Sequence, residues 1–230
     1  FIEKSVDVFF RVKEKEPKLA AVGGNLEVVH ENDFATLVSS LYSSPFSGGS
    51  SFWYSKGPHF ANTVVFGFYH KRIVENIGCF DEDMISGEDF ELSLRLVKKR
   101  YKLYYSPEIK AYYYARGSFS SFLKQSFNYG AAKGICIRKG YFNFVWFVPL
   151  AFVFYQLLLL AGFFVQNLGL LIALFTPFAA YWIINVLVSL QLFRKKRILL
   201  FLPLMFWLFH NIIGFGFLVG SVLGRKTFTR

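Results

Sequence analysis

A stretch of 53 residues, from Tyr141 to Phe193, contains no charged side chain. A membrane-spanning helix needs about 20 predominantly apolar residues, so this stretch is too long for one crossing and suits two. Segments 147–165 and 170–193 each meet that length, and the short polar sequence QNLG separates them. The alternative is a buried helical hairpin in a soluble protein, but soluble helices rarely lack charge over such a length. We therefore predict two transmembrane helices here.

A third apolar segment, 198–224, follows the basic sequence RKKR at 194–197 and differs from the first two. Pro203 interrupts its start, and His210 and Asn211 are polar at its middle. Its second half carries glycines in the small-xxx-small spacing of closely packed helices, at Gly216, Gly220 and Gly224. We predict a full crossing, because 27 residues are enough for one tilted helix. The alternative is a broken or re-entrant element, whose backbone would have to be shielded from lipid.

Charge divides the chain into two parts. All 15 acidic residues lie between Glu3 and Glu108 together with 13 basic residues, whereas the remainder carries 13 basic residues and no acid. This distribution indicates membrane lipids, and not nucleic acid, as the partner of the basic part. The basic clusters before the first predicted span and after the second should both face the cytoplasm. We therefore expect a multi-pass protein of the cell (inner) membrane whose N-terminal part is cytoplasmic, and its two unpatterned cysteines fit that reducing compartment.

The N-terminal part predicts alternating helices and strands. Asn32 or Asp33 is placed to cap the start of the second helix. Apolar periodicity and turn residues indicate helices at 1–17, 32–44, 70–78 and from Glu88, a loop at 44–58, and strands at 19–29, 62–69, 101–107 and 109–115. Such an alternation predicts an α/β layered fold.

The helix from Glu88 begins with three acids. Its apolar residues recur with a spacing of four, three and four, which predicts one buried face made by Phe90, Leu94, Val97 and Tyr101. Glu91 and Arg95 are expected to form a surface pair one turn apart. The acids at the helix start have a purely structural explanation, because they complement the helix dipole. The alternative is that one of them is a base that takes part in a reaction.

The order of four motifs favours the second explanation. These motifs are VGGN, SPFSGG, NTVVFGFYHKRIVENIGCFDEDMISGEDFELSLRL and YYYARGSFSSFLKQSFNYGAAKG, between about residues 19 and 140. Together they resemble the family-two glycosyltransferases, most closely the membrane-bound branch that builds succinoglycan and other exopolysaccharides. The resemblance implies an α/β fold, namely the C-terminal part of a GT-A (Rossmann-like) domain at 1–140, cytoplasmic and holding the acceptor half of the site. Transmembrane α-helices at 141–230 would follow it.

The resemblance also implies sugar transfer from a nucleotide-sugar donor with inversion. In such enzymes the acid of the Glu-Asp pair is the general base, which corresponds to Asp89. It would take the proton of the acceptor hydroxyl, and the helix dipole would help to keep it ionised. Glu88 would orient the site or the acceptor. The capping and catalytic interpretations of these two acids are compatible.

The helix SFSSFLKQSFNYGAAKG stands where membrane-bound relatives carry a Gln-x-x-Arg-Trp motif. Here Gln125 is followed by Asn128 and Tyr129, so clamping through an arginine is not available at that place. Gln125 and Tyr129 share a helix face and are expected to bind substrate. Their alternative role is ordinary interfacial packing.

Three further residues are predicted to bind substrate. Arg116 and Lys133 are cations that could meet a diphosphate, or could instead be membrane-surface charge. Gly67 could let a sugar lie close to the backbone, although a lone glycine in a strand more often marks a bulge. The donor is expected to be a nucleotide sugar and the acceptor a lipid-linked or polymeric glycan.

No metal ligands are assigned in this chain. The resemblance implies an Asp-x-Asp pair for Mg²⁺ or Mn²⁺, and no such pair occurs in suitable context before Asp81. We therefore expect the chain to begin within a longer protein and to be inactive by itself. Asp81, Glu82 and Asp83 fit a loop and helix cap better than a metal site, and the four histidines lack ligand spacing. The alternative function is a non-catalytic membrane scaffold or degenerate subunit of a polysaccharide assembly complex.

Overall fold

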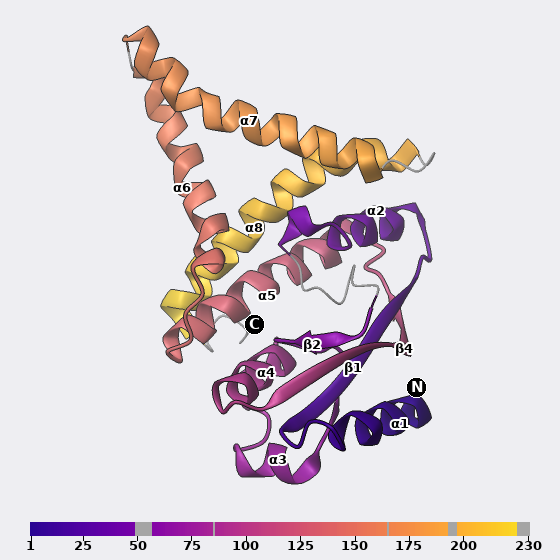
Figure 1. Ribbon diagram of the computed structural model, residues 1–230. Helices are drawn as coiled ribbons and strands as arrows, with labels where there is room; N and C mark the ends of the chain where they lie inside the picture. The colour runs from indigo at the N-terminus through magenta and orange to yellow at the C-terminus, as the bar shows by residue number, and fades with distance from the viewer. Residues whose placement is uncertain (49–56, 85, 165, 193–196, 225–230) are drawn as a thin grey trace. The chain divides into compact units, whose positions relative to one another are not determined.

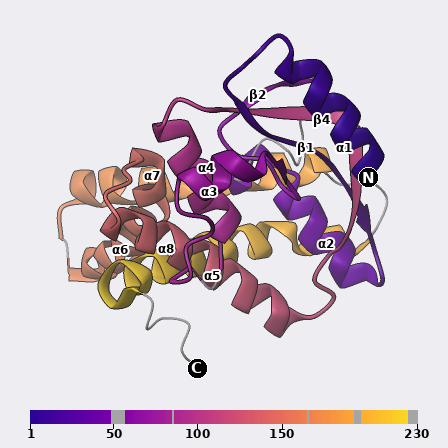
Figure 2. The same ribbon diagram turned by 90° about the horizontal axis from the view of Figure 1, so that it is seen from below.

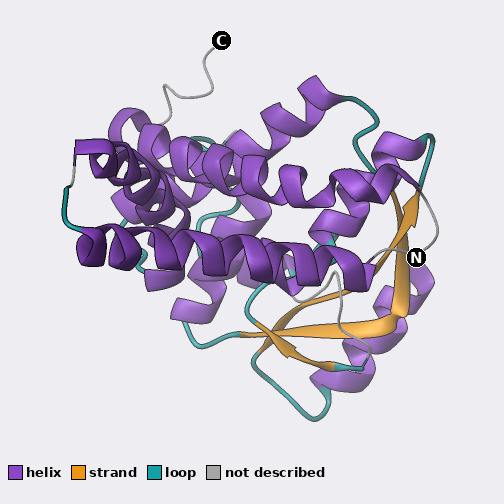
Figure 3. Cartoon of the chain, turned by 90° about the horizontal axis from the view of Figure 1, so that it is seen from above, coloured by secondary structure: helices purple, strands orange, loops and turns teal. Residues whose placement is uncertain are grey.

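The computed structural model describes residues 1–48, 57–84, 86–164, 166–192 and 197–224. The chain forms two compact units. The first, here the sheet unit, comprises residues 1–31 and 42–115, and the second, the helical unit, comprises 32–41 and 116–230. In Figure 3 the strands, in orange, gather in the sheet unit.

A four-stranded mixed sheet organises the first unit (Figure 1). Two long strands pair in parallel at its centre, and two short strands flank them in antiparallel orientation. In the spatial order β2-β4-β1-β3, the strands are His59–Ala61, Lys102–Tyr114, Leu19–Val29 and Phe68–Tyr69. The prediction of an α/β fold is confirmed at this coarse level, because helices pack on this sheet.

Two hydrophobic clusters lie against the sheet. The first joins helix α1 (Ile2–Lys13) to β1 and β4 through Val8, Phe9, Leu19, Val22 and Ile109. The second joins α3 (Lys71–Asn76) and α4 (Glu88–Lys98) to the same strands through Ala20, Ala21, Val64, Ile73, Leu92, Leu96 and Leu103. The second cluster fixes α4, and therefore the position of its acidic first turn.

The glycine pair of β1 allows two chain segments to approach its backbone. A side chain at Gly23 would lie 2.6 Å from Cβ of Val64, and one at Gly24 would overlap the carbonyl oxygen of Ile109. The pairing of β1 with β4 shifts between Gly24 and the next residue, so residues 107–109 form a bulge at this point. These glycines therefore serve packing within the sheet unit.

Two strand predictions are wrong in detail. Only Phe68–Tyr69 of the predicted strand 62–69 is a strand, because the preceding segment passes over Gly23 and turns at Phe66, whose φ is 46°. The predicted strands 101–107 and 109–115 form one strand, since the bulge accommodates Pro107 without ending β4.

The buried face of α4 also differs from the prediction. Leu92 and Leu96 are fully buried, whereas Val97 is 37% exposed. Glu91 and Arg95 do form the predicted pair, with Nε of Arg95 donating to Oε2 of Glu91 over 2.9 Å. The pair is not on the surface, because Glu91 is only 1% exposed. The helix is therefore rotated so that this ion pair faces inward.

The second unit consists of helices. They are α2 (Asp33–Tyr42), α5 (Phe119–Arg138), α6 (Val148–Ala161), α7 (Leu168–Leu192) and α8 (Leu202–Leu223), with short 3-10 turns at Phe144–Phe147, Gly162–Phe164 and Arg197–Phe201. Asn32 caps α2 as predicted, because its Oδ1 accepts a hydrogen bond of 2.8 Å from the N–H of Ala35.

Two of these helices are long and apolar enough to cross a membrane, by length and composition. They are Leu168–Leu192 and the continuous stretch Arg197–Leu223, in which Pro203 stands in the first turn of α8 and does not break it. The first predicted span differs, because its continuous helix, Phe144–Leu160, is shorter than these two. Its 17 residues cover about 26 Å at the α-helical rise, which is less than the hydrocarbon core of a bilayer.

Helices α5 and α8 lie side by side with their backbones in close approach (Figures 1 and 2). On α5, a side chain at Gly130 or Gly134 would overlap the carbonyl oxygen of Ile213 or Phe217. On α8, side chains at two further glycines would overlap carbonyl oxygens of α5 in the same way, at Gly216 and Gly220. The predicted close packing is thus confirmed for those two glycines of α8, and its partner is α5.

Polar side chains join α6, α7 and α8. Gln156 accepts a hydrogen bond from Nε1 of Trp207 and donates one to Oδ1 of Asn211, each of 2.7 Å. The hydroxyl of Tyr181 lies 3.0 Å from Nδ1 of His210. The two polar residues at the middle of the third apolar segment therefore bind neighbouring helices of the same unit.

Candidate active site at the start of helix α4

The first turn of α4 presents Glu88 and Asp89. Gly87 precedes them in a left-handed conformation with φ 75°, which reverses the chain into the helix. Glu88 is exposed, whereas Asp89 is half-buried. Oδ1 of Asp89 accepts a hydrogen bond of 2.7 Å from the N–H of Phe90, and the hydroxyl of Ser93 donates to its carbonyl oxygen over 2.8 Å.

Burial raises the pKa of the Asp89 carboxyl above its usual range, and the neighbouring charge of Glu88 raises it further. The hydrogen bond from the N–H of Phe90 opposes this shift. The helix start therefore stabilises the carboxylate less than its burial destabilises it. A carboxylate with a raised pKa binds a proton more strongly, which suits a group that removes a proton from a hydroxyl.

Tyr69 is the neighbour of Asp89 that the sequence did not reveal. Its hydroxyl oxygen is buried and has no hydrogen-bond partner among the described residues. Burial raises the pKa of this hydroxyl above its usual range, and the charges of Asp89 and Glu88 add to the effect. Gly67, two residues earlier, is a signal that could have indicated it, because a side chain there would meet the Tyr69 ring.

Gly67, predicted to let a sugar approach the backbone, lies against this tyrosine. A side chain at Gly67 would come within 2.6 Å of two ring atoms of Tyr69. The glycine thus makes room for the ring, and its contact with a sugar stays a prediction.

The loop before α4 is held by Arg95. Its guanidinium donates to the carbonyl oxygens of Ile77 over 2.8 Å and Cys79 over 2.5 Å, in addition to its bond with buried Glu91. An open hollow of about 400 Å³ lies over this loop, lined by Gly78, Cys79, Phe80, Asp81, Glu82 and Arg95.

The acids of this loop cap a turn. Oδ1 of Asp81 accepts a hydrogen bond of 2.9 Å from the N–H of Asp83, as the loop interpretation predicts. Among the residues that the structure describes, no three His, Cys, Asp or Glu side chains are grouped to bind a metal ion. These residues therefore do not fit the Mg²⁺ or Mn²⁺ that the resemblance implies.

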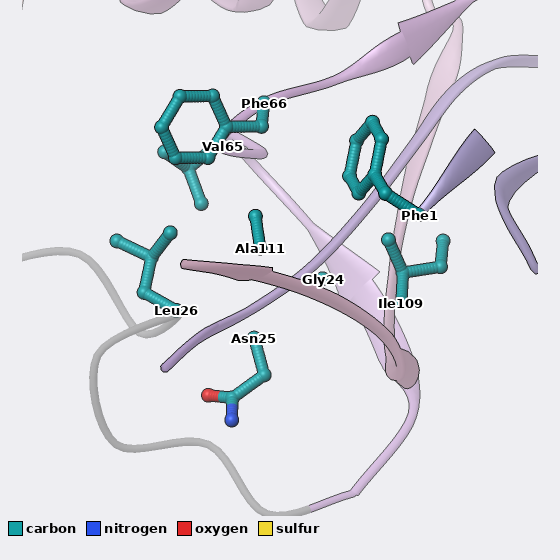
Figure 4. Close-up of a pocket in the computed structure, with 8 residues that line it drawn as sticks. All are labelled: Phe1, Gly24, Asn25, Leu26, Val65, Phe66, Ile109 and Ala111. Carbon is teal, nitrogen blue, oxygen red and sulfur yellow. The ribbon is translucent and has the colours of Figure 1, made fainter. Parts of the chain in front are cut away.

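A second hollow of the sheet unit is too small for a ligand. It lies where residues 65 and 66 approach Gly24 of β1, beside the bulge of β4 (Figure 4), and it leaves no room for a water molecule. Its lining is almost wholly apolar, and is made by Phe1, Gly24, Asn25, Leu26, Val65, Phe66, Ile109 and Ala111.

The other predicted substrate-binding residues belong to the helical unit. On α5, Nε2 of Gln125 donates to the hydroxyl of Tyr129 over 3.2 Å, so these two residues share a face as predicted. Lys133, one turn further on, is mostly buried, and burial lowers the pKa of its ammonium group. No hydrogen-bond or ion-pair partner for that ammonium group lies in the described part of the chain. Arg116 is exposed before α5.

Comparison with known proteins places this site in context. No protein-family model matches the chain, and no solved structure matches it. A relative from Methanococcus voltae, dolichyl N-acetyl-alpha-D-glucosaminyl phosphate 3-beta-D-2,3-diacetamido-2,3-dideoxy-beta-D-glucuronosyltransferase, is 43% identical over 229 residues. The match covers 99% of this chain and 68% of the relative. At this identity and coverage, the chain belongs to the glycosyltransferase family that includes this enzyme.

Proposed function

We propose that the chain is part of an inverting membrane glycosyltransferase that moves a sugar from a nucleotide-sugar donor to a lipid-linked acceptor. The Methanococcus voltae relative acts on a dolichyl-linked sugar phosphate, which favours a lipid-linked acceptor over a free polysaccharide. Two helices with the length and apolar composition of membrane spans support the same choice. The family membership supports the transferase over the non-catalytic scaffold.

The half-buried carboxylate of Asp89 is the observation that carries the mechanism. It would take the proton from the acceptor hydroxyl while that oxygen forms a bond to the anomeric carbon of the donor sugar. The bond from the anomeric carbon to the nucleotide diphosphate breaks in the same step, and attack from the opposite side inverts the carbon. Glu88 is exposed beside Asp89 and would orient the acceptor.

The residues of the helical unit would bind the charged parts of the substrates. Lys133 is the strongest of these, because a buried ammonium group without a partner among the described residues is costly and a phosphate would neutralise it. Gln125 and Tyr129 would contribute hydrogen bonds from the same face of α5. Arg116 and Gly67 stay in the proposal as substrate contacts. No step is assigned to a metal ion, since the described residues do not fit one.

The proposal places the protein in the cell membrane with several crossings and with the sheet unit in the cytoplasm. The basic residues before α6 and at 194–197 support this orientation.

The test compares Asp89→Asn with wild type in membranes that contain the full-length protein. Substrates are dolichyl N-acetylglucosaminyl phosphate and nucleotide-activated 2,3-diacetamido-2,3-dideoxyglucuronic acid, by analogy with the relative. Asp89→Asn should lower turnover by about 10²–10⁴-fold, the usual contribution of a general base. Asp7→Asn, an exposed acid on α1, is the matched control and should keep wild-type turnover.

Two results would contradict the proposal. If Asp89→Asn transfers sugar at nearly the wild-type rate, Asp89 is not the base. If the folded wild-type protein transfers no sugar from any of a panel of nucleotide sugars, the scaffold alternative is favoured.

A further inference from the structure

A buried hydroxyl without a hydrogen-bond partner reduces stability, so its presence needs an explanation. The hydroxyl of Tyr69 is such a group among the described residues. Phenylalanine would fill the same space without that cost. The tyrosine is therefore expected to have a partner in the working enzyme that is not bonded to it in this arrangement of side chains.

The structure holds the Tyr69 ring firmly. The residue lies in β3, where it is opposite Ala21 of the central strand β1. Its ring packs edge-on against Phe80, with ring centroids 6.1 Å apart, and Gly67 leaves the space that the ring occupies. A group placed by a sheet and by packing on two sides can act as a fixed hydrogen-bond donor.

Tyr69 packs against the cluster that includes Leu92 and Leu96 of α4, which brings its hydroxyl near Ser93 and Asp89 of the same helix. The interaction with Ser93 is too weak in geometry to count as a hydrogen bond, although it favours the ionised form of Tyr69. Ser93 donates its own proton to the carbonyl oxygen of Asp89 and lies 3.4 Å from the hydroxyl of Thr63. Asp89 receives a hydrogen bond at Oδ1 from the N–H of Phe90, and no side chain in the described ranges donates to its carboxylate. A rotation of the Asp89 side chain away from Phe90 would offer Tyr69 an ionised acceptor, which makes the stronger bond.

We propose that Tyr69 is a positioning residue, whose hydroxyl donates a hydrogen bond to the Asp89 carboxylate and holds it toward the acceptor. This inference rests on the proposed function, because it assigns Asp89 the role of base. It adds a residue outside the Glu-Asp pair that determines both the orientation of the base and the pH at which it works.

The groups around Asp89 determine in which direction loss of the Tyr69 hydroxyl would shift the pKa of the Asp89 carboxyl. Glu88 on the same helix destabilises the Asp89 carboxylate, and the N–H of Phe90 stabilises it. Burial keeps Tyr69 on β3 in its neutral, donating form, since it raises the pKa of that hydroxyl. A hydrogen bond from Tyr69 would favour the ionised form of Asp89. Without it, the pKa of Asp89 rises further and less of the base is ionised at a given pH.

The experiment compares wild type with Tyr69→Phe, Ser93→Ala and Asp89→Asn in the full-length protein in lipid nanodiscs. An infrared pH titration follows the carboxyl band that is present in wild type and absent in Asp89→Asn, so it needs no substrate. Turnover against pH is measured with the two probe substrates named above. Tyr112→Phe, on an exposed tyrosine, is the matched control.

Tyr69→Phe should raise the pH at which the Asp89 carboxyl band titrates, and it should raise by the same amount the pH below which turnover declines. At pH values below this decline, turnover should be about 10- to 100-fold lower than in wild type, the value of a hydrogen bond to a charged group. The variant should stay folded, because the phenylalanine ring fills the same space as the tyrosine ring. Ser93→Ala and Tyr112→Phe should leave both the titration of the Asp89 carboxyl band and the pH dependence of turnover unchanged.

Three results would overturn the inference. An unshifted band in Tyr69→Phe would show that the hydroxyl is only a packing feature. A shift of the same size in Ser93→Ala would show that the effect runs through the serine. Loss of folding in Tyr69→Phe would show that the hydroxyl is structural. In each case the proposed function still stands if Asp89→Asn abolishes transfer, and it fails independently if Asp89→Asn is active.

Discussion

Substitution of one glycine on each side of the α5–α8 contact tests the packing of the helical unit. Gly130→Ala would place a methyl group on the carbonyl oxygen of Ile213, and Gly216→Ala would place one on that of Phe127. Both obstacles are backbone atoms of a helix, so no side chain can move aside. The two helices must separate to accommodate either methyl group.

The expected magnitude combines two opposing effects. Overpacking of this kind costs about 1–3 kcal/mol, whereas alanine is about 1 kcal/mol better than glycine inside a helix. Each single variant should therefore lose up to about 2 kcal/mol of unfolding free energy. The double variant should lose less than the sum of the two, because one separation of the helices relieves both overlaps.

The assay is SDS-induced unfolding in mixed micelles, followed by the near-ultraviolet signal of the aromatic residues. Gly169→Ala on α7 is the matched control, because its nearest neighbour would be a side-chain oxygen at 3.3 Å. It should be neutral or stabilising. The packing described for α5 and α8 would be refuted if both single variants also gained about 1 kcal/mol and the gains added in the double variant.

Four further predictions follow from other parts of the molecule. Arg95→Ala leaves the carboxylate of Glu91 buried without its cation and should cost about 3–5 kcal/mol of unfolding free energy, whereas Lys99→Ala, on an exposed residue, should cost almost nothing. Burial raises the pKa of Asp89 in the folded protein above its unfolded value of about 3.9. The contribution of Asp89 to the unfolding free energy should therefore fall as the pH rises from the unfolded pKa through the folded one. Asp89→Asn should therefore be the more stable protein at pH 7 and lose this advantage at pH 3, as measured by thermal unfolding. A cysteine at Thr229 should react with an impermeant reagent in intact cells if segment 198–224 crosses the membrane, and protection until the cells are opened would contradict the crossing. The 230-residue chain alone should show no tight nucleotide-sugar binding by calorimetry, because no Asp-x-Asp pair in suitable context occurs before Asp81.

Local sequence signals predicted most elements of the sheet unit. The periodic apolar residues of 2–13, the glycine-containing strand 19–29 and the helix from Glu88 are present at nearly the expected bounds. Their periodicity and end signals are local, so a linear sequence contains them. The strand expected at 62–69 failed, because Val64 packs over Gly23 of a distant strand and draws this segment out of the sheet. That contact joins residues about 40 positions apart, and no local pattern encodes it.

The orientation of α4 could not be predicted for a similar reason. The helix carries two apolar stripes, one through Phe90 and Leu94 and another through Leu92 and Leu96. Periodicity shows that a stripe exists but does not show which one faces the sheet. In the structure Leu92 and Leu96 face inward, and the guanidinium of Arg95 donates to the carbonyl oxygens of Ile77 and Cys79. These contacts join residues 16 and 18 positions apart, so the local pattern does not contain them.

In the helical unit, by contrast, a local pattern predicted a contact between distant parts of the chain. The glycine spacing in α8 correctly predicted a close contact, but its partner α5 lies more than 70 residues earlier in the chain. Gly130 and Gly134 repeat the same four-residue spacing on α5. Two matching glycine patterns on helices therefore indicate a pair even when the sequence separation is large.

Two acids of α4 show how environment assigns different roles to the same side-chain chemistry. Glu91 is buried beside a guanidinium that neutralises it and that also holds the preceding loop, so its charge serves the fold. Asp89, two residues earlier, is half-buried with no cation among the described residues that pairs with it, and burial raises its pKa. The presence or absence of a paired cation thus separates a structural carboxylate from one that binds a proton more strongly. On this argument the helix start combines an exposed acid at Glu88, a structural ion pair at Glu91 and, between them, a half-buried carboxylate whose raised pKa favours a bound proton.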